Sequence, residues 1–248
     1  MEHTASTVLL VMLVAAIPTL VAGVAFVPLL QPRGVGQREI AAAFAFASGL
    51  MLGGGYLLLA ERIASAPVFV VLGACFGAAY TFVAQRFVAH EWPIEQRESD
   101  SIDDAAVVNV MLQSALHAVP EGVAIGVAMA VRFELGLFVA LALAVHNVAE
   151  GTALAAALRR RGLSLFQAAM MCILSELPQP MLAVAAFLIT SESRARLALG
   201  LGVAAGALIH LVLTELLPIC YRQSDRRAVA LLVSGSTGLV VLLKGFLA

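Results

Sequence analysis

Residues 105–158 read AAVVNVMLQSALHAVPEGVAIGVAMAVRFELGLFVALALAVHNVAEGTALAAAL, which is two long apolar runs joined at Arg132. Each run exceeds the roughly 20 residues that a helix needs to cross a bilayer. Each also carries a phrase of the form His-x-x-x-Glu-Gly, at His117–Gly122 and at His146–Gly151. Because ionisable groups at membrane depth are costly, two copies of one phrase on consecutive runs predict an intramembrane ion or substrate pathway.

The rest of the chain shares this apolar character, with 61% hydrophobic and 12% charged residues. That composition excludes an ordinary soluble domain. The lack of short alternating segments excludes a β-barrel, and a net charge of −1 argues against a nucleic-acid partner. We expect an all-α polytopic membrane protein with a single domain over residues 1–248. The start is taken as a span because no cationic region precedes it. The predicted spans are Thr7–Leu30, Ile40–Glu61, Pro67–Arg86, Ala105–Val131, Gly136–Leu158, Leu163–Thr190, Leu197–Pro218 and Ala228–Ala248.

Arginine placement predicts the orientation, because short cytoplasmic loops carry the excess of positive charge. The odd-numbered loops hold ten arginines: Arg33, Arg38, Arg86, Arg97, Arg159, Arg160, Arg161, Arg222, Arg226 and Arg227. The even-numbered loops hold four: Arg62, Arg132, Arg194 and Arg196. We therefore expect the odd loops in the cytoplasm, both termini outside, and a multi-pass location in the inner (plasma) membrane.

The longest connection, residues 87–104, is polar and acidic. Such a segment is either a solvated linker, the usual role of acidic sequence, or a weak cation-collecting loop at the inner exit. The three cysteines, Cys75, Cys172 and Cys220, have no CxxC spacing and are expected to pack as free thiols.

The two phrases have the composition of a metal site. His117 and Glu121, like His146 and Glu150, are four residues apart and share a helix face. The two runs are antiparallel, so four facing side chains would supply two nitrogens and two carboxylates. That set suits zinc, iron, manganese or cadmium. The alternative is that each His–Glu pair is only an internal hydrogen bond. Pro120 removes the helical donor for the carbonyl of Leu116, which is expected to leave it unpaired and kink the helix.

Other polar or soft side chains lie at membrane depth. Glu176 and Gln179 are neighbours at i,i+3 beside two prolines, and either is a candidate ligand. Glu215 is either an exit ligand or a solvated interfacial glutamate. His210 is expected to be a packing histidine. Met51, in a glycine-rich run, would favour soft metals.

With these residues in place, the chain resembles the ZIP family of divalent-metal transporters. The resemblance covers eight spans, outside termini, the long loop after the third span, and motifs in spans two, four, five, six and seven. It implies metal ligands at His117, Glu121, His146, Asn147 and Glu150, with Met51 and the span-six position Gln179 beside them. The sequence departs from the family pattern where Ala118 replaces Asn, Gln179 replaces Glu and Thr214 replaces His.

The resemblance implies uptake of a divalent metal toward the cytoplasm, zinc first, with one helix bundle moving against another. The metal is the substrate, no prosthetic group is expected, and the partners are the metal and membrane lipid. A homodimer is left open. Two alternatives remain: an intramembrane zinc-dependent hydrolase, and a relative that binds metal without transporting it.

The charge of the ligand set also predicts a stoichiometry. Two neighbouring dications repel strongly in a low-dielectric site. With Glu121 and Glu150 as the main negative groups, we expect one tightly held ion per chain and only a weak second one. Glu176 would change this balance only if its side chain points inward.

Overall fold

The computed structural model describes residues 5–25, 36–87 and 104–247. Helices supply the regular secondary structure of these residues. Their bounds are α1 Ala5–Val24, α2 Gln37–Arg62, α3 Pro67–Phe87, α4 Asp104–Val131, α5 Phe133–Arg160, α6 Leu165–Ser175, α7 Pro178–Thr190, α8 Arg194–Leu211, η2 Val212–Leu216, α9 Leu217–Gln223 and α10 Arg226–Leu247.

By length and composition, the described helices form eight segments able to cross a membrane. The sixth combines α6 with α7, and the seventh combines α8, η2 and α9. The predicted all-α fold with eight spans is therefore confirmed. The end predicted for the first span, residues 26–30, and the acidic connection 88–103 lie outside the described residues.

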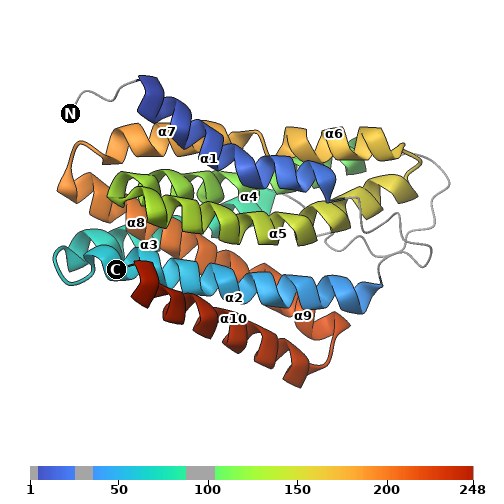
Figure 1. Cartoon of the computed structure of the whole chain (residues 1–248). Coiled ribbons are helices and arrows are strands. Elements are labelled where there is room, and N and C mark those ends of the chain that lie inside the picture. Colours follow the sequence, from blue (N-terminus) through green and yellow to red (C-terminus); the bar gives the residue numbers. More distant parts are fainter. Residues whose placement is uncertain (1–4, 26–35, 88–103, 248) are drawn as a thin grey trace.

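The helices pack as two groups. In one group α1 packs on α5 and α4 packs on α7; in the other α3 packs on α8 and α2 packs on α10. Figure 1 shows α1, α6 and α7 along one side of the molecule, α2 and α10 along the other, and α4 and α5 between them. Contacts of α4 with α8 and of α5 with α2 join the groups. Both helices that carry the His-x-x-x-Glu-Gly phrase therefore face the seam between the groups.

The sixth span is broken at its centre, although the sequence was expected to form one run over Leu163–Thr190. Pro178 and Pro180 have no N–H, so the carbonyls of Leu174 and Glu176 lose their α-helical donors. Those carbonyls accept instead from the N–H groups three residues on, those of Leu177 and Gln179, at 3.3 and 3.1 Å. This tighter turn separates α6, which ends at Ser175, from α7, which begins at Pro178. Proline is tolerated in the first turn of a helix. The break places Glu176 outside both helices, beside the seam.

The fourth span stays helical across Pro120. The expectation that the carbonyl of Leu116 is left unpaired was wrong, because the hydroxyl of Tyr80 on α3 donates to it at 3.3 Å. A neighbouring helix thus supplies the hydrogen bond that the proline removes, as is common for prolines in membrane helices.

Glycines of the two phrases allow close helix contacts, as predicted from their size. A Cβ atom on Gly122 would meet the backbone of Gln179, and one on Gly151 would meet Ala22 and Ala25. Gly126, one turn after Gly122, lies in the same way on the backbone of Ala183. These contacts bring α4 against α7 and α5 against α1, which closes the group of helices around the polar side chains.

Candidate metal centre

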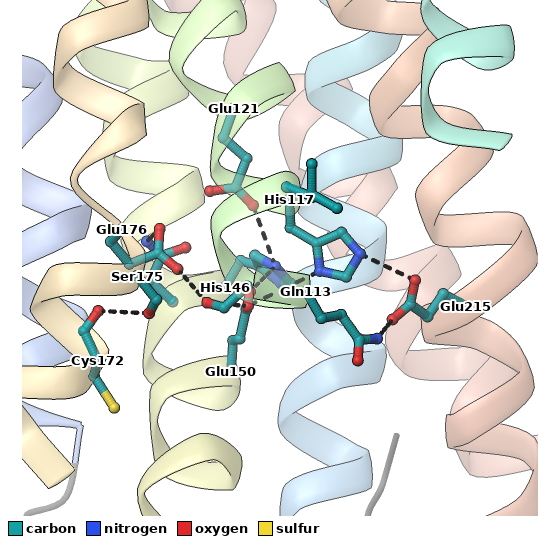
Figure 2. Close-up of polar contacts among 12 residues, drawn as sticks. Gln113, His117, Glu121, His146, Glu150, Cys172, Ser175, Glu176 and Glu215 are labelled. Atoms are coloured by element: carbon teal, nitrogen blue, oxygen red, sulfur yellow. Dashed lines mark hydrogen bonds and ion pairs between the residues drawn. The ribbon is translucent and has the colours of Figure 1, made fainter. Parts of the chain in front are cut away.

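A cluster of buried polar side chains lies between α4, α5, the α6–α7 break and η2. Figure 2 shows the labelled glutamates and histidines of this cluster pointing toward one another between the helices. Of the nine residues predicted as ligands, eight are joined by hydrogen bonds and ion pairs into this one network: His117, Glu121, His146, Asn147, Glu150, Glu176, Gln179 and Glu215.

Three of these side chains converge on one point. Nε2 of His146 lies 3.3 Å from Oε1 of Glu121 and 3.1 Å from Oε2 of Glu150. One ligand atom from each residue lies within 4.8 Å of the other two, and all three residues are buried. We call Glu121, His146 and Glu150 the trio. Among the described residues, Nδ1 of His146 has no hydrogen-bond partner, and the contacts of Nε2 with the two carboxylates lack hydrogen-bond geometry. A single N–H also cannot serve two carboxylates at once. Such an arrangement fits a cation bound by all three.

His117 occupies a different environment from His146, although both come from the same phrase. Its Nδ1 lies 4.0 Å from Oε1 of Glu150, at the edge of the trio. Its Nε2 lies 3.1 Å from Oε2 of Glu215 in η2, across the seam. The sequence predicted that His117, Glu121, His146 and Glu150 converge together. In the structure three of them converge, and His117 lies beside them.

Glu215 is buried, which removes the alternative of a solvated interfacial glutamate. Besides His117, it accepts hydrogen bonds from the amides of Gln113 at 2.7 Å and Gln85 at 3.2 Å. It lies in the π-helical turn Val212–Leu216. Wide turns of this kind occur often at functional sites.

Glu176 points into the cluster, the condition that the sequence left undecided. Its Oε1 accepts from the hydroxyl of Ser114 at 3.0 Å and its Oε2 from the amide of Asn147 at 3.3 Å. The same Ser114 hydroxyl lies 2.9 Å from Oε1 of Glu150. The carboxylates of Glu150 and Glu176 are thus held on either side of one serine.

Gln179 touches the trio through its NH₂ group, which lies 3.2 Å from Oε2 of Glu121. Its amide oxygen accepts from the hydroxyl of Thr19 on α1 at 3.1 Å. In this structure Gln179 therefore orients Glu121, and its oxygen is engaged elsewhere. The sequence predicted an oxygen ligand at this position.

Met51 and His210 take no part in the hydrogen bonds and ion pairs that link this network among the described residues. Met51 is buried in the hydrophobic core on α2, and its role as a soft ligand stays a prediction. His210 packs edge to face on Phe82, with ring centroids 6.4 Å apart, in keeping with a packing histidine. The three cysteines are free, as expected.

Sequence reasoning missed Ser114, Gln113 and Thr19. Ser114 had a signal, because Ser114, His117 and Glu121 follow the i, i+3, i+7 spacing of one helix face. Thr19 and Gln113 had none, since their partners lie more than 100 residues away along the chain.

The cluster concentrates negative charge. For Glu121 and Glu150, the ion pairs found within the described residues are with the two histidines, and Glu176 is held by hydrogen bonds. Buried carboxylates are costly unless a cation or proton compensates them. A narrow cavity lined by His117, His146, Glu150 and Glu215 reaches the cluster. The arrangement is therefore suited to taking up and releasing a cation.

Known proteins similar to this chain are also described as metal transporters. The family model of the ZIP zinc transporters matches residues 95–244. A putative zinc transporter of Arabidopsis thaliana is 33% identical over 187 residues, which are 74% of this chain and 30% of the relative. The zinc transporter GufA of Myxococcus xanthus is 33% identical over 166 residues, 66% of this chain and 65% of the relative. The matched part is thus less than two thirds of the length of either relative.

Proposed function

Because the chain belongs to the ZIP zinc transporter family, we propose that it carries a divalent transition metal across a membrane, with Zn²⁺ as the first candidate. The metal is the substrate and binds at Glu121, His146 and Glu150. The proposed direction is uptake into the cytoplasm, across the plasma membrane.

The observation that carries this proposal is the convergence of the trio. One imidazole nitrogen and two carboxylate oxygens lie within 4.8 Å of one another in a buried position. That donor set matches the preferences of zinc and its neighbours, which accept nitrogen and oxygen ligands together. It is a poor match for Mg²⁺, which prefers oxygen ligands and keeps its waters.

Membership of a transporter family favours transport over an intramembrane hydrolase. The trio supports the same choice, since both carboxylates already face His146 and would serve as ligands. A hydrolase would need one of them free to act as the general base for a metal-bound water.

The test is zinc flux into proteoliposomes that contain the purified full chain and a trapped zinc indicator. We expect flux from the unmodified chain and none from His146→Ala. Zinc affinity of that variant should fall by more than about 100-fold, since losing even a group that only supports a ligand costs about 10- to 100-fold.

His210→Ala is the matched control, because His210 lies outside the network and should leave flux intact. Unchanged flux in His146→Ala would overturn the proposed site. Tight zinc binding without flux in the unmodified chain would identify a non-transporting relative.

A further inference from the structure

We propose that Gln85, on α3, is a positioning residue for the metal site. Its side-chain amide holds the carboxylate of Glu215 against His117, and this contact fixes which ring nitrogen His117 turns toward the trio. Gln85 therefore acts through two other side chains and is not itself a ligand. The inference rests on the proposed function in one respect, since an effect on bound metal requires that the trio binds one.

The first observation is how the amide of Gln85 divides its hydrogens. Its NH₂ group lies 3.0 Å from the hydroxyl oxygen of Thr214 and 3.2 Å from Oε2 of Glu215. An amide NH₂ group has two hydrogens, so both bonds form at once. The hydroxyl of Thr214 gives its own hydrogen to the carbonyl one turn before it, at 2.8 Å, and so accepts from Gln85. One amide thus holds two consecutive residues of the π-helical turn.

The second observation is that α3 and α8 are fixed in one register. Glycines on both helices let the two backbones touch, because a Cβ atom on any of them would meet backbone atoms of the other helix. Helices in such close contact cannot slide past each other without clashes. The chain positions of Gln85 and Glu215 are each about two turns beyond the last of these glycines. The glycines are Gly73 and Gly77 of α3, and Gly202 and Gly206 of α8.

The third observation is the ring orientation of His117. An ionised carboxylate only accepts hydrogen bonds, so Nε2 of His117, 3.1 Å from Oε2 of Glu215, turns its N–H toward that oxygen. Nδ1 then faces Oε1 of Glu150, at 4.0 Å, and is the nitrogen left to bind a metal at the trio. Histidine ligands usually donate their other N–H to a carboxylate, which fixes the ring.

The carboxylate of Glu215 is held on both of its oxygens. Gln113 on α4 donates to Oε1 at 2.7 Å, whereas His117 and Gln85 share Oε2 (Figure 2). Gln113 and His117 both approach from α4, across the seam. Gln85 belongs to the same helix group as Glu215, so it holds the carboxylate from the opposite side and keeps it from rotating away from His117.

The same helix also reaches the backbone beside His117. Tyr80 on α3 donates to the carbonyl of Leu116 at 3.3 Å. Two side chains of α3 thus set the position of His117, one at the residue before it and one at the carboxylate beyond it. This gives a helix with none of the predicted ligands a part in the geometry of the site.

The first measurement needs no metal. The purified full chain, labelled with ¹⁵N-histidine and held in lipid nanodiscs, should show by NMR an Nε2–H proton of His117 that exchanges slowly with water. His117→Asn assigns this signal by removing it. Gln85→Met keeps the length of the side chain but removes the amide, and it should speed the exchange.

Thr81→Val is the matched control for this measurement. Thr81 lies one turn before Gln85 on α3, and its hydroxyl lies 3.2 Å from the carbonyl of Gly77 and 3.5 Å from that of Ala207. The variant removes a polar group from the same face of the same helix but leaves the amide of Gln85 in place. It should leave the exchange of the His117 proton unchanged.

The second measurement is zinc affinity of the same samples. Gln85→Met should weaken zinc binding by about 10-fold, the low end of the range for groups that support a ligand. In a Glu215→Ala background it should add nothing, because the chain of contacts is already broken. A merely structural role would cost the same in both backgrounds. Thr214→Val, at an exposed position, is a second variant in case Gln85→Met does not fold, and it should cause a smaller loss.

Unchanged proton exchange in both Gln85→Met and Thr214→Val would overturn the inference, as would an equal loss of zinc affinity with and without Glu215. These outcomes differ from failure of the proposed function. Zinc flux together with a His117 proton that ignores Gln85 refutes only the positioning role. A His117 proton released by Gln85→Met, in a chain that binds no zinc, supports the positioning of His117 and refutes the metal site.

Discussion

The hydroxyl of Tyr80 replaces the backbone donor that Pro120 lacks. This hydroxyl, on α3, donates a hydrogen bond to the carbonyl of Leu116 on α4. The bond therefore joins the two helix groups. His117 follows Leu116 directly, so this bond fixes the backbone next to the metal cluster. A carbonyl left unpaired in an apolar setting costs about 1–3 kcal/mol.

Tyr80→Phe should therefore lower stability by about 1–3 kcal/mol in the unmodified chain. In a Pro120→Ala background the cost should be smaller, because the alanine N–H restores the helical bond to Leu116. The measurement is a double-mutant cycle on thermal unfolding of the purified protein in detergent. Tyr221→Phe, at an exposed tyrosine, is the control and should change little. Equal costs of Tyr80→Phe in both backgrounds would refute the coupling.

At the residue scale, the sequence predicted which side chains gather but not how they pair. The repeated His-x-x-x-Glu-Gly motif predicted that His117 and His146 lie at the same membrane depth. Both side chains belong to the cluster. Their partners differ because, of the two histidines, it is His117 that pairs with Glu215, from a span 98 residues further along the chain. No local spacing encodes such a contact. The inward turn of Glu176 was equally hidden, since it depends on a helix break.

At the scale of helices, the contact between α4 and α7 depends on glycine. Both Gly122 and Gly126 lie against the backbone of α7, which leaves no room for a Cβ atom. The same packing sets the distance between Oε2 of Glu121 on α4 and Nε2 of Gln179 on α7, which is 3.2 Å. Close helix packing is thus a condition for the geometry of the trio.

Gly126→Ala should destabilise the protein by about 1–3 kcal/mol, the usual range for forcing extra volume into a packed core. We expect a lower thermal unfolding temperature and weaker zinc binding, because α4 must move away from α7. Gly54→Ala is the matched control. A Cβ atom there meets nothing within 4 Å, so alanine should be neutral or slightly stabilising through its higher helix propensity. Equal behaviour of the two variants would contradict the packing argument.

The number of spans and their helical type were predictable from the sequence because apolar length alone specifies a span. The interruptions were not predicted. The break at Glu176 coincides with Pro178 and Pro180. The π-helical turn at Val212–Leu216 comes just before Pro218, which lacks the N–H that the carbonyl of Thr214 would take in an α-helix, a signal that the sequence analysis did not use. Both interruptions bring a glutamate into the cluster, so the features that sequence reasoning missed are those that complete the site.

At the scale of the whole molecule, polar contacts join the two helix groups along the seam. The ion pair of His117 with Glu215 lies at the cluster. The pair of Arg132 with Glu61, at 3.1 Å, lies where α4 turns into α5 and α2 ends. These two pairs tie the group that carries the trio to the other group, at the centre and at one end.

Orientation in the membrane stays a prediction that rests on the arginines. A cysteine placed by Arg160→Cys, in a chain with Cys75→Ala, should resist an impermeant thiol reagent added to intact cells. Glu192→Cys, at the exposed connection between α7 and α8, should react readily, since it lies at the opposite end of the spans. Ready labelling of the first and protection of the second would invert the topology.

The two oxygens of Glu150 face different partners, Oε2 toward His146 and Oε1 toward Ser114. A metal bound at the trio would engage one oxygen of Glu150 while the hydroxyl of Ser114 holds the other, so the carboxylate is oriented before an ion arrives. A ligand that is ordered in advance lowers the entropy cost of binding.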